Sequence, residues 1–274
     1  MKTPALYVAC QQWNRPMVEA LKGHATGLIL GDLFCQKRMF ENEWFDVIDF
    51  ARLARELGLE VIFQTPVYNT TRNLEPTISL VRKMAANSLI DAVLVHDIGV
   101  VESLAELESI ALWWDRFSFN RDFVPNAHLI DFLTAHRVSR VEVTRPGHIR
   151  EVAEQGCGVL LYGYGPQIAS FGRICYTEYF LNEPCERKIL CSCSRPFIAS
   201  SDKVPLQYVA DGYTLLDKDE PMHPLPQLDA SLRTKVDGVT AYIRNQGEIA
   251  SLDKMVTDLS NSALSAEASL QAGD

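Results

Sequence analysis

The segment "EWFDVIDFARLARELGLEVIFQTP", residues 43–66, predicts a helix followed directly by a strand. Its first part places apolar residues on one broad helical face with the charges opposite, and Gly58 follows as a helix C-cap. The run 60–66 is short, β-branched and bounded by Pro66, which is typical of a buried parallel strand. The segment therefore predicts a unit in which an amphipathic helix covers a parallel sheet.

The same alternation extends over the first 163 residues. Further strands are predicted at 5–10, 27–32, 92–97, 116–120, 140–145 and 158–163. Amphipathic segments between them are predicted as helices at 15–24, 75–88, 103–116, 126–137 and 146–156. Seven strands alternating with six helices favour an α/β protein built as a modified or incomplete (β/α) TIM-like barrel.

The alternation stops after Gly163. A cysteine-rich segment at 164–195 is followed by a predicted β-hairpin around "SSDK" in residues 196–220, and by a predicted helix at 228–248. We expect residues 1–248, cysteine-rich segment included, to form a single barrel domain. The stretch "SNSALSAEASLQAGD" at 260–274 is mostly small and polar, and we expect a mobile C-terminal tail over residues 249–274.

The composition argues against nucleic acids and membranes as partners. The net charge of −9 gives no strong indication of nucleic-acid binding, since proteins that bind nucleic acids carry basic faces. No run approaches the roughly 20 apolar residues of a membrane-spanning helix, and the N-terminus does not have the pattern of a signal peptide. We therefore expect a cytoplasmic protein, in which clustered cysteines more often mean metal or redox chemistry than disulfides.

In a parallel barrel, ligands gather where the strands reach their carboxyl edge. The predicted strand ends carry the following candidates: Asp32 with Cys35, Lys37 and Arg38; Gln64 with Thr65; His96 with Asp97; Asn120 with Arg121; and Glu142 with Arg145. His96 and Asp97 form a candidate proton-transfer pair, although a structural histidine is an equal alternative. Trp113 and Trp114 are expected in the core, on the helix at 103–116.

The cysteines are the second set of candidates. Cys175, Cys185, Cys191 and Cys193 crowd one segment with C-x9-C, C-x5-C and C-x-C spacing, and Cys35 follows an early strand. Zinc prefers two close C-x2-C pairs, whereas iron–sulfur clusters accept wider spacing with one remote ligand. The spacing favours an iron–sulfur site and leaves zinc and no metal open. Cys10 and Cys157 lie in or beside apolar strands and are expected to be small buried hydrophobes.

Three stretches carry a family resemblance. They are "GLILGDLFCQKR" around Cys35, "HDIGVVESLAE" at 96–106, and "GVLLYGYGPQIASFGRICYTEYF", which aligns Tyr162-Gly163, Pro166, Ala169, Arg173 and Cys175. Their collinear order over about residues 5–195 resembles the UbiV-like branch of the peptidase U32 family. The resemblance implies a barrel-like protein that binds a [4Fe–4S] cluster and works with a second U32 family protein in oxygen-independent hydroxylation during ubiquinone biosynthesis.

The resemblance also implies site residues. Cys35 and Cys175 match the first two cluster ligands, and we assign Cys185 and Cys193 as the other two. Cys191 could replace either, because the family separates its last pair by three residues and this chain does not. Arg38 would balance the cluster or bind an anionic substrate; a surface salt bridge is the alternative.

The resemblance leaves several functions open. A heterodimer acting on a small aromatic or prenylated substrate is the expected arrangement. The alternatives are a U32-type peptidase, an RNA-modification relative, and a non-catalytic iron–sulfur partner. The chain has no G-x-S-x-G elbow, which makes a serine peptidase the weaker interpretation.

Overall fold

A computed structural model gives the structure of the chain. It describes residues 4–10, 13–31, 47–66, 71–115, 126–165, 168–171, 176, 197–201, 204–211, 214–217, 228–243, 245–249 and 251–252.

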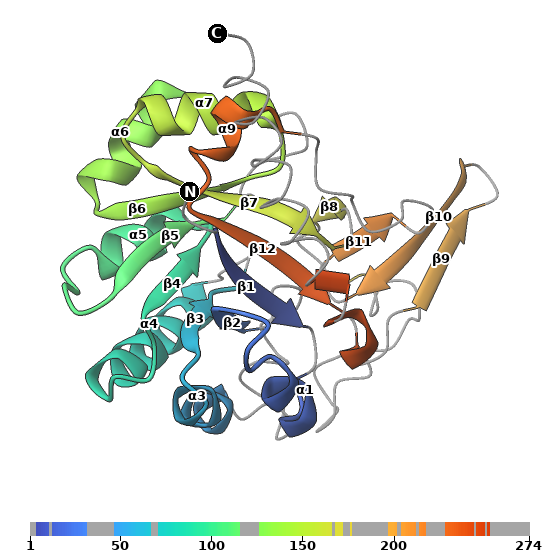
Figure 1. Cartoon of the computed structure of the whole chain (residues 1–274), viewed down its shortest axis with the longest axis horizontal. Helices are drawn as coiled ribbons and strands as arrows, with labels where there is room; N and C mark the ends of the chain where they lie inside the picture. The colour runs from blue at the N-terminus through green and yellow to red at the C-terminus, as the bar shows by residue number, and fades with distance from the viewer. Residues whose placement is uncertain are drawn as a thin grey trace, which may run out of the picture.

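Eight parallel strands close into a barrel (Figure 1). They are β1 (Ala5–Cys10), β2 (Gly27–Leu30), β3 (Glu60–Gln64), β4 (Ala92–Val95), β5 (Ala111–Trp114), β6 (Val138–Val143), β7 (Gly158–Tyr164) and β12 (Gly238–Ile243). Neighbours follow chain order from β1 to β7, and β12 closes the ring between β7 and β1. The predicted (β/α) barrel is thus confirmed, and it is complete.

Helices surround the barrel on the outside (Figure 1). They are α1 (Arg15–Ala20), α3 (Val47–Glu56), α4 (Thr71–Ala86), α5 (Ile98–Leu104), α6 (Ala127–Ala135), α7 (Pro146–Glu154) and the short α9 (Ala230–Arg233), with a 3-10 turn at η4 (Gln246–Glu248). Local sequence sets their ends. Asn14 caps α1 by accepting a hydrogen bond from the Met17 amide at 3.0 Å, and Asn126 caps α6 in the same way. Gly58 follows α3 with a φ of +78°, as the C-cap prediction required.

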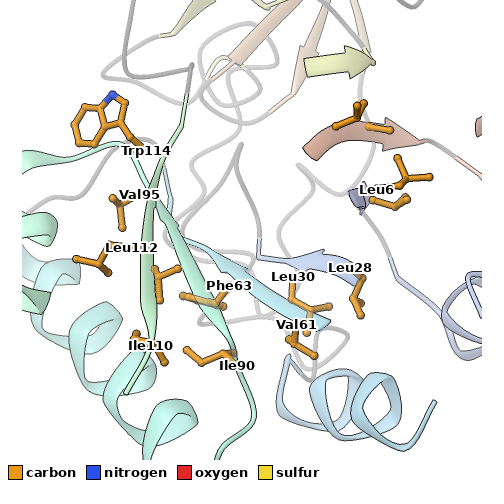
Figure 2. Close-up of a cluster of buried hydrophobic side chains, with 14 of the residues drawn as sticks. Leu6, Leu28, Leu30, Val61, Phe63, Ile90, Val95, Ile110, Leu112 and Trp114 are labelled. Carbon is orange, nitrogen blue, oxygen red and sulfur yellow. The ribbon is translucent and has the colours of Figure 1, made fainter. Parts of the chain in front are cut away.

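Two apolar layers hold the barrel. The outer layer lies between strands and helices and includes Leu28, Leu30, Val61, Phe63 and Trp114, which Figure 2 labels with their neighbours. A separate inner layer fills the barrel itself, with Tyr7, Ala9, Ile29, Ile62, Ala92, Leu94, Trp113, Leu160, Tyr162 and Tyr242. Burial on both faces explains why the strands read as continuous apolar runs.

A second, antiparallel sheet lies to one side of the barrel (Figure 1). It has the order β8-β11-β10-β9, formed by β8 (Ile168–Phe171), β9 (Phe197–Ser201), β10 (Val204–Asp211) and β11 (Thr214–Asp217). Strands β9 and β10 form the predicted hairpin around "SSDK". The hairpin prediction is confirmed, and β11 pairs back onto β8, the strand that follows the barrel's β7.

Two sequence predictions were wrong. The first is the helix predicted at 103–116. Helix α5 stops at Leu104, and residues 111–114 form strand β5 instead. Trp113 belongs to the inner layer and Trp114 to the outer one, an alternation that a strand produces and a helix does not. The strand predicted at 116–120 lies outside the described residues.

The helix predicted at 228–248 is the second error. Only the four residues of α9 are helical within its described part before β12 begins. All six residues of β12 are buried, so its sequence lacks the polar face that separates a surface helix from a buried strand. Its pairing with β1 and β7 supplies the eighth strand that the sequence analysis did not count.

The remaining boundaries were not tested. A single domain over 1–248 and a mobile tail at 249–274 stay predictions. Within the ranges that the structure describes, no helix has the length and apolar character needed to cross a membrane.

Candidate functional site

The inner face of the barrel changes from apolar to polar toward the carboxyl ends of its strands. Ile62, Leu94 and Trp113 belong to the inner apolar layer. Two residues further along the chain, Gln64 ends β3, while His96 and Asp115 directly follow β4 and β5. On the other side of the barrel, Glu142 of β6 and Thr240 of β12 are also polar and buried. We call Gln64, His96, Asp115, Glu142 and Thr240 the polar layer.

Asp115 is the centre of one half of this layer. Its Oδ2 atom accepts a hydrogen bond from Gln64 Nε2 at 2.5 Å and lies 3.5 Å from His96 Nδ1. The Asp115 backbone amide bonds to the Val95 carbonyl at 2.8 Å, which fixes the residue beside the end of β4. Gln64 and Asp115 come from strands two apart in the barrel, so their contact crosses the interior in front of His96.

His96 is held from both sides. Its Nε2 atom contacts the main-chain oxygen of Thr65, and its Nδ1 atom faces Asp115, with both side chains of the pair fully buried. Because a carbonyl only accepts, Nε2 carries a proton in this arrangement. Nδ1 is therefore the ring nitrogen nearest to Asp115, and at 3.5 Å it makes no hydrogen bond among the described residues.

The proton-transfer pair predicted from the sequence was wrong in its partner. Asp97 caps helix α5, and its Oδ1 atom accepts the Gly99 amide at 2.8 Å. The carboxylate that faces His96 is Asp115, from the next strand. Asp115 is not a candidate from the sequence alone, because the pattern at 103–116 predicts a helix where the structure has β5. The sequence did contain an indication of this strand. The segment "ALWWD" is a short apolar run that ends in Asp, like "AVLVHD" of the strand before it.

The second half of the polar layer joins β6 to β12. Thr240 Oγ1 donates a hydrogen bond to Glu142 Oε1, and the two residues are 3% exposed each. Strand β7 lies between β6 and β12, so this contact also crosses the interior. Glu142 was a sequence candidate as a strand-end residue; Thr240 was not, because its strand was read as helix.

A second group of polar side chains also crosses the barrel interior. Arg140 Nη1 donates to the Tyr7 hydroxyl at 3.1 Å, and that hydroxyl donates to Glu60 Oε2 at 2.9 Å. The Arg140 guanidinium also lies 4.7 Å from the centre of the Trp113 ring. Burial raises the pKa of Tyr7 to about 12; Arg140 opposes this shift and Glu60 adds to it. These residues join three strands, and Tyr7 is the register partner of Thr240 in the polar layer.

The cysteine site lies outside the described residues, as do the predicted ligands Cys35, Cys175, Cys185 and Cys193, their alternative Cys191, and Arg38. The described part of the chain contains no group of three or more His, Cys, Asp or Glu side chains that could hold a metal ion.

Two further cysteines are described. Cys10 is 2% exposed and Cys157 is 6% exposed, which confirms both as buried. Burial raises the pKa of the Cys157 thiol, whose Sγ atom contacts the Val138 carbonyl at 3.5 Å. A neutral, buried thiol is a poor nucleophile and a poor metal ligand.

Comparison with known proteins shows the fold. No family model and no curated protein sequence matches the chain. Among solved structures, it is similar to the U32 peptidase Mk0906, with a TM-score of 0.53 and 13% identity over 89% of this chain and 94% of that chain. A chain of the tryptophan synthase α2β2 complex of Pyrococcus furiosus gives a TM-score of 0.50 at 13% identity, covering 94% and 97% of the two chains.

A tryptophan synthase structure from M. tuberculosis gives the same TM-score of 0.50 at 8% identity, covering 95% of this chain and 93% of that one. These likenesses agree with the closed barrel and its surrounding helices. The chain is therefore a (β/α) barrel protein. Its fold is similar to that of a U32 peptidase, as the sequence resemblance had led us to expect.

Proposed function

We propose that this chain is a U32-type [4Fe–4S] protein of the UbiV-like branch, and that it acts as one subunit of an oxygen-independent hydroxylation system in ubiquinone biosynthesis. The observation that carries the proposal is the point at which the cysteine motifs join the barrel. Cys35 follows the end of β2, and Cys175 follows β8, the strand directly after β7. Strand ends of this kind are where parallel barrels hold their ligands.

Sequence spacing supports this proposal. Cys35 comes four positions after Gly31, the residue that follows β2, and Cys175 comes four positions after Phe171 at the end of β8. Cys185 and Cys193 would complete a four-thiolate set, with Cys191 as the alternative to either one. Arg38 would offset the negative charge of four thiolates.

A peptidase is the alternative, because the similar solved structure is described as a U32 peptidase. A cysteine or serine peptidase needs a histidine nitrogen that accepts a proton from the nucleophile. In the described part of the chain, the two nitrogens of His96 face the Thr65 carbonyl and the Asp115 carboxylate. This arrangement favours a histidine that orients a carboxylate over one that activates a nucleophile.

The first experiment tests the cluster. The protein is purified without oxygen, and iron, acid-labile sulfide and absorption near 400 nm are measured for wild type, Cys35→Ala and Cys175→Ala. We expect about four iron atoms in wild type and loss of the cluster in both variants. Cys10→Ala and Cys157→Ala are matched controls that remove buried thiols, and both should retain iron. Full iron content in the Cys35 and Cys175 variants would refute the assignment.

The second experiment tests the partner and cellular location. A second U32 family protein is co-expressed with this chain, and the pair is purified through a tag on one subunit. We expect a stable heterodimer in the cytoplasmic fraction, active on a small aromatic or prenylated substrate. A monodisperse monomer with full hydroxylation activity would count against the heterodimer. A colourless protein that cleaves peptides would favour the peptidase.

A further inference from the structure

We propose that the guanidinium group of Arg140 is a binding site for a carboxylate. The carboxylate would belong to a small organic acid or to the C-terminus of a protein partner. The inference goes beyond the cluster proposal and holds whether or not the cysteines bind iron, because the residues that carry it belong to strands of the described barrel.

Two contacts hold the guanidinium in place. Its Nη1 atom donates to the Tyr7 hydroxyl at 3.1 Å, and its central carbon lies 4.7 Å from the centre of the Trp113 ring. The Tyr7 hydroxyl is itself fixed by its hydrogen bond to Glu60 Oε2 at 2.9 Å. An arginine held in this way loses little further side-chain entropy when a ligand binds to it.

These contacts leave the Nε and Nη2 edge of the guanidinium unused. Neither atom makes a hydrogen bond to a described residue, and neither is a buried nitrogen, so both reach solvent. The two nitrogens form the planar fork that can donate to both oxygens of one carboxylate. Arg140 therefore presents the edge of its side chain that recognises carboxylates.

The charge of Arg140 is also without an ion-pair partner. Among the residues that the structure describes, no carboxylate lies within ion-pair distance of its guanidinium. Arg140 is half-buried, so its charge has lost part of its hydration without gaining an opposite charge. A bound anion would supply that opposite charge.

The surroundings favour an anion with a single charge. Glu60 is exposed and shares the Tyr7 hydroxyl with Arg140. A second carboxylate lies nearby, because a Cβ atom added to Gly158 would be 2.9 Å from Asp237 Oδ2 and 3.0 Å from Arg140 Cγ. Both carboxylates repel an anion, and they repel a doubly charged phosphate about twice as strongly as a carboxylate.

The experiment titrates the full-length protein into 4-fluorobenzoate and follows the fluorine NMR signal of the probe. 4-Fluorobenzamide is the matched neutral probe, because it keeps the ring and lacks the charge. We expect saturable binding of the acid, with a dissociation constant on the order of 1 mM, and no binding of the amide.

Competition identifies the source of the carboxylate. A short peptide is added to the bound probe, once with a free C-terminal carboxylate and once with a C-terminal amide. Only the free acid should displace the probe. Displacement at a lower concentration than unlabelled benzoate requires assigns a protein C-terminus, and the reverse order assigns a small organic acid. Equal displacement by the peptide amide would contradict recognition of a carboxylate.

Substitutions of Arg140 test the fork. Arg140→Met should abolish binding of the acid, and Arg140→Lys, which keeps the charge without the fork, should weaken it about tenfold. Arg82→Met is the matched control, because Arg82 is an exposed arginine of α4 whose Nη2 atom donates to the Ser103 main-chain oxygen at 3.3 Å. This variant should bind the acid as wild type does.

Glu60→Gln tests the charge in the opposite direction. It removes a carboxylate beside Arg140 and should tighten binding about threefold, an effect that loss of folding cannot produce. It decides the matter if circular dichroism shows that the Arg140 variants have not folded. Absence of saturable binding to the wild type, equal binding of acid and amide, unchanged affinity in folded Arg140 variants, or weaker binding in Glu60→Gln would each overturn the proposal.

Discussion

Arg140 and Tyr7 lie on strands three positions apart in the barrel order, and the Arg140 guanidinium donates to the Tyr7 hydroxyl at 3.1 Å. The Tyr7 hydroxyl in turn donates a hydrogen bond to Glu60, so one phenol links β6, β1 and β3 across the barrel. Polar groups that span a barrel interior in this way fix the strands relative to one another, because each partner loses its hydrogen bond if one strand moves.

Tyr7→Phe should therefore destabilise the fold. The substitution keeps the ring against Trp113 but removes the hydroxyl that accepts from Arg140 and donates to Glu60. We expect the free energy of unfolding, measured with urea, to fall by about 1–3 kcal/mol. Tyr7→Phe, Arg140→Met and the double variant form a cycle, and additive effects of the two single changes would show that the bond contributes nothing.

The same phenol predicts a pH dependence. The pKa of Tyr7 is about 12 in the folded protein and near 10 when unfolded. Its contribution to stability is fully present below pH 10 and is lost as the pH rises toward 12, since only the unfolded chain releases the proton in that interval. Unfolding at several alkaline pH values should show a shallower decline for Tyr7→Phe than for wild type. Identical slopes would contradict this assignment.

The end of β2 supports a third prediction. Gly31 has a φ of +135°, and an added Cβ would overlap the Gln64 main-chain oxygen. We expect Gly31→Ala to lower the free energy of unfolding by about 1–3 kcal/mol. Gly58→Ala is the matched control, because Gly58 also has a positive φ but nothing lies within 4 Å of its added Cβ. The Gly31 variant should be the less stable of the two in urea, and equal losses would contradict the steric explanation.

The barrel could be predicted from sequence because its outer helices have two faces. In α3, for example, Ala51, Leu53 and Ala54 are buried beside exposed Arg52 and Arg55, so the apolar period is visible in the sequence. Strands bounded by glycine or proline could be predicted from the sequence equally well. Strand β12 was not, since all six of its residues are buried and a continuous apolar run contains no period.

The candidate site was only partly predictable for the same reason. Gln64, His96 and Glu142 were recognised because they follow or end strands that had been placed correctly. Asp115 and Thr240 were missed because β5 and β12 had been read as helices. Which carboxylate faces His96 depends on strand order in space, and a carboxylate next to it in the sequence points elsewhere. The cysteine ligands remain predictions from motif and spacing.

The last prediction concerns acid pH and helix α7. His148 is 9% exposed, and burial lowers its pKa from the ordinary value of 6.5; Glu151 opposes the shift and Arg145 adds to it. The unfolded chain therefore takes up a proton more readily than the folded one as the pH falls through about 6.5, so stability falls toward acid pH.

His148→Leu removes this titration and should flatten the decrease in melting temperature between about pH 7 and pH 5. His128→Leu, at an exposed position on α6, is the matched control and should retain the wild-type slope. If both variants keep that slope, the acid sensitivity of the fold arises from other groups. Burying the protonated His148 side chain would then cost less free energy than its buried position on α7 indicates.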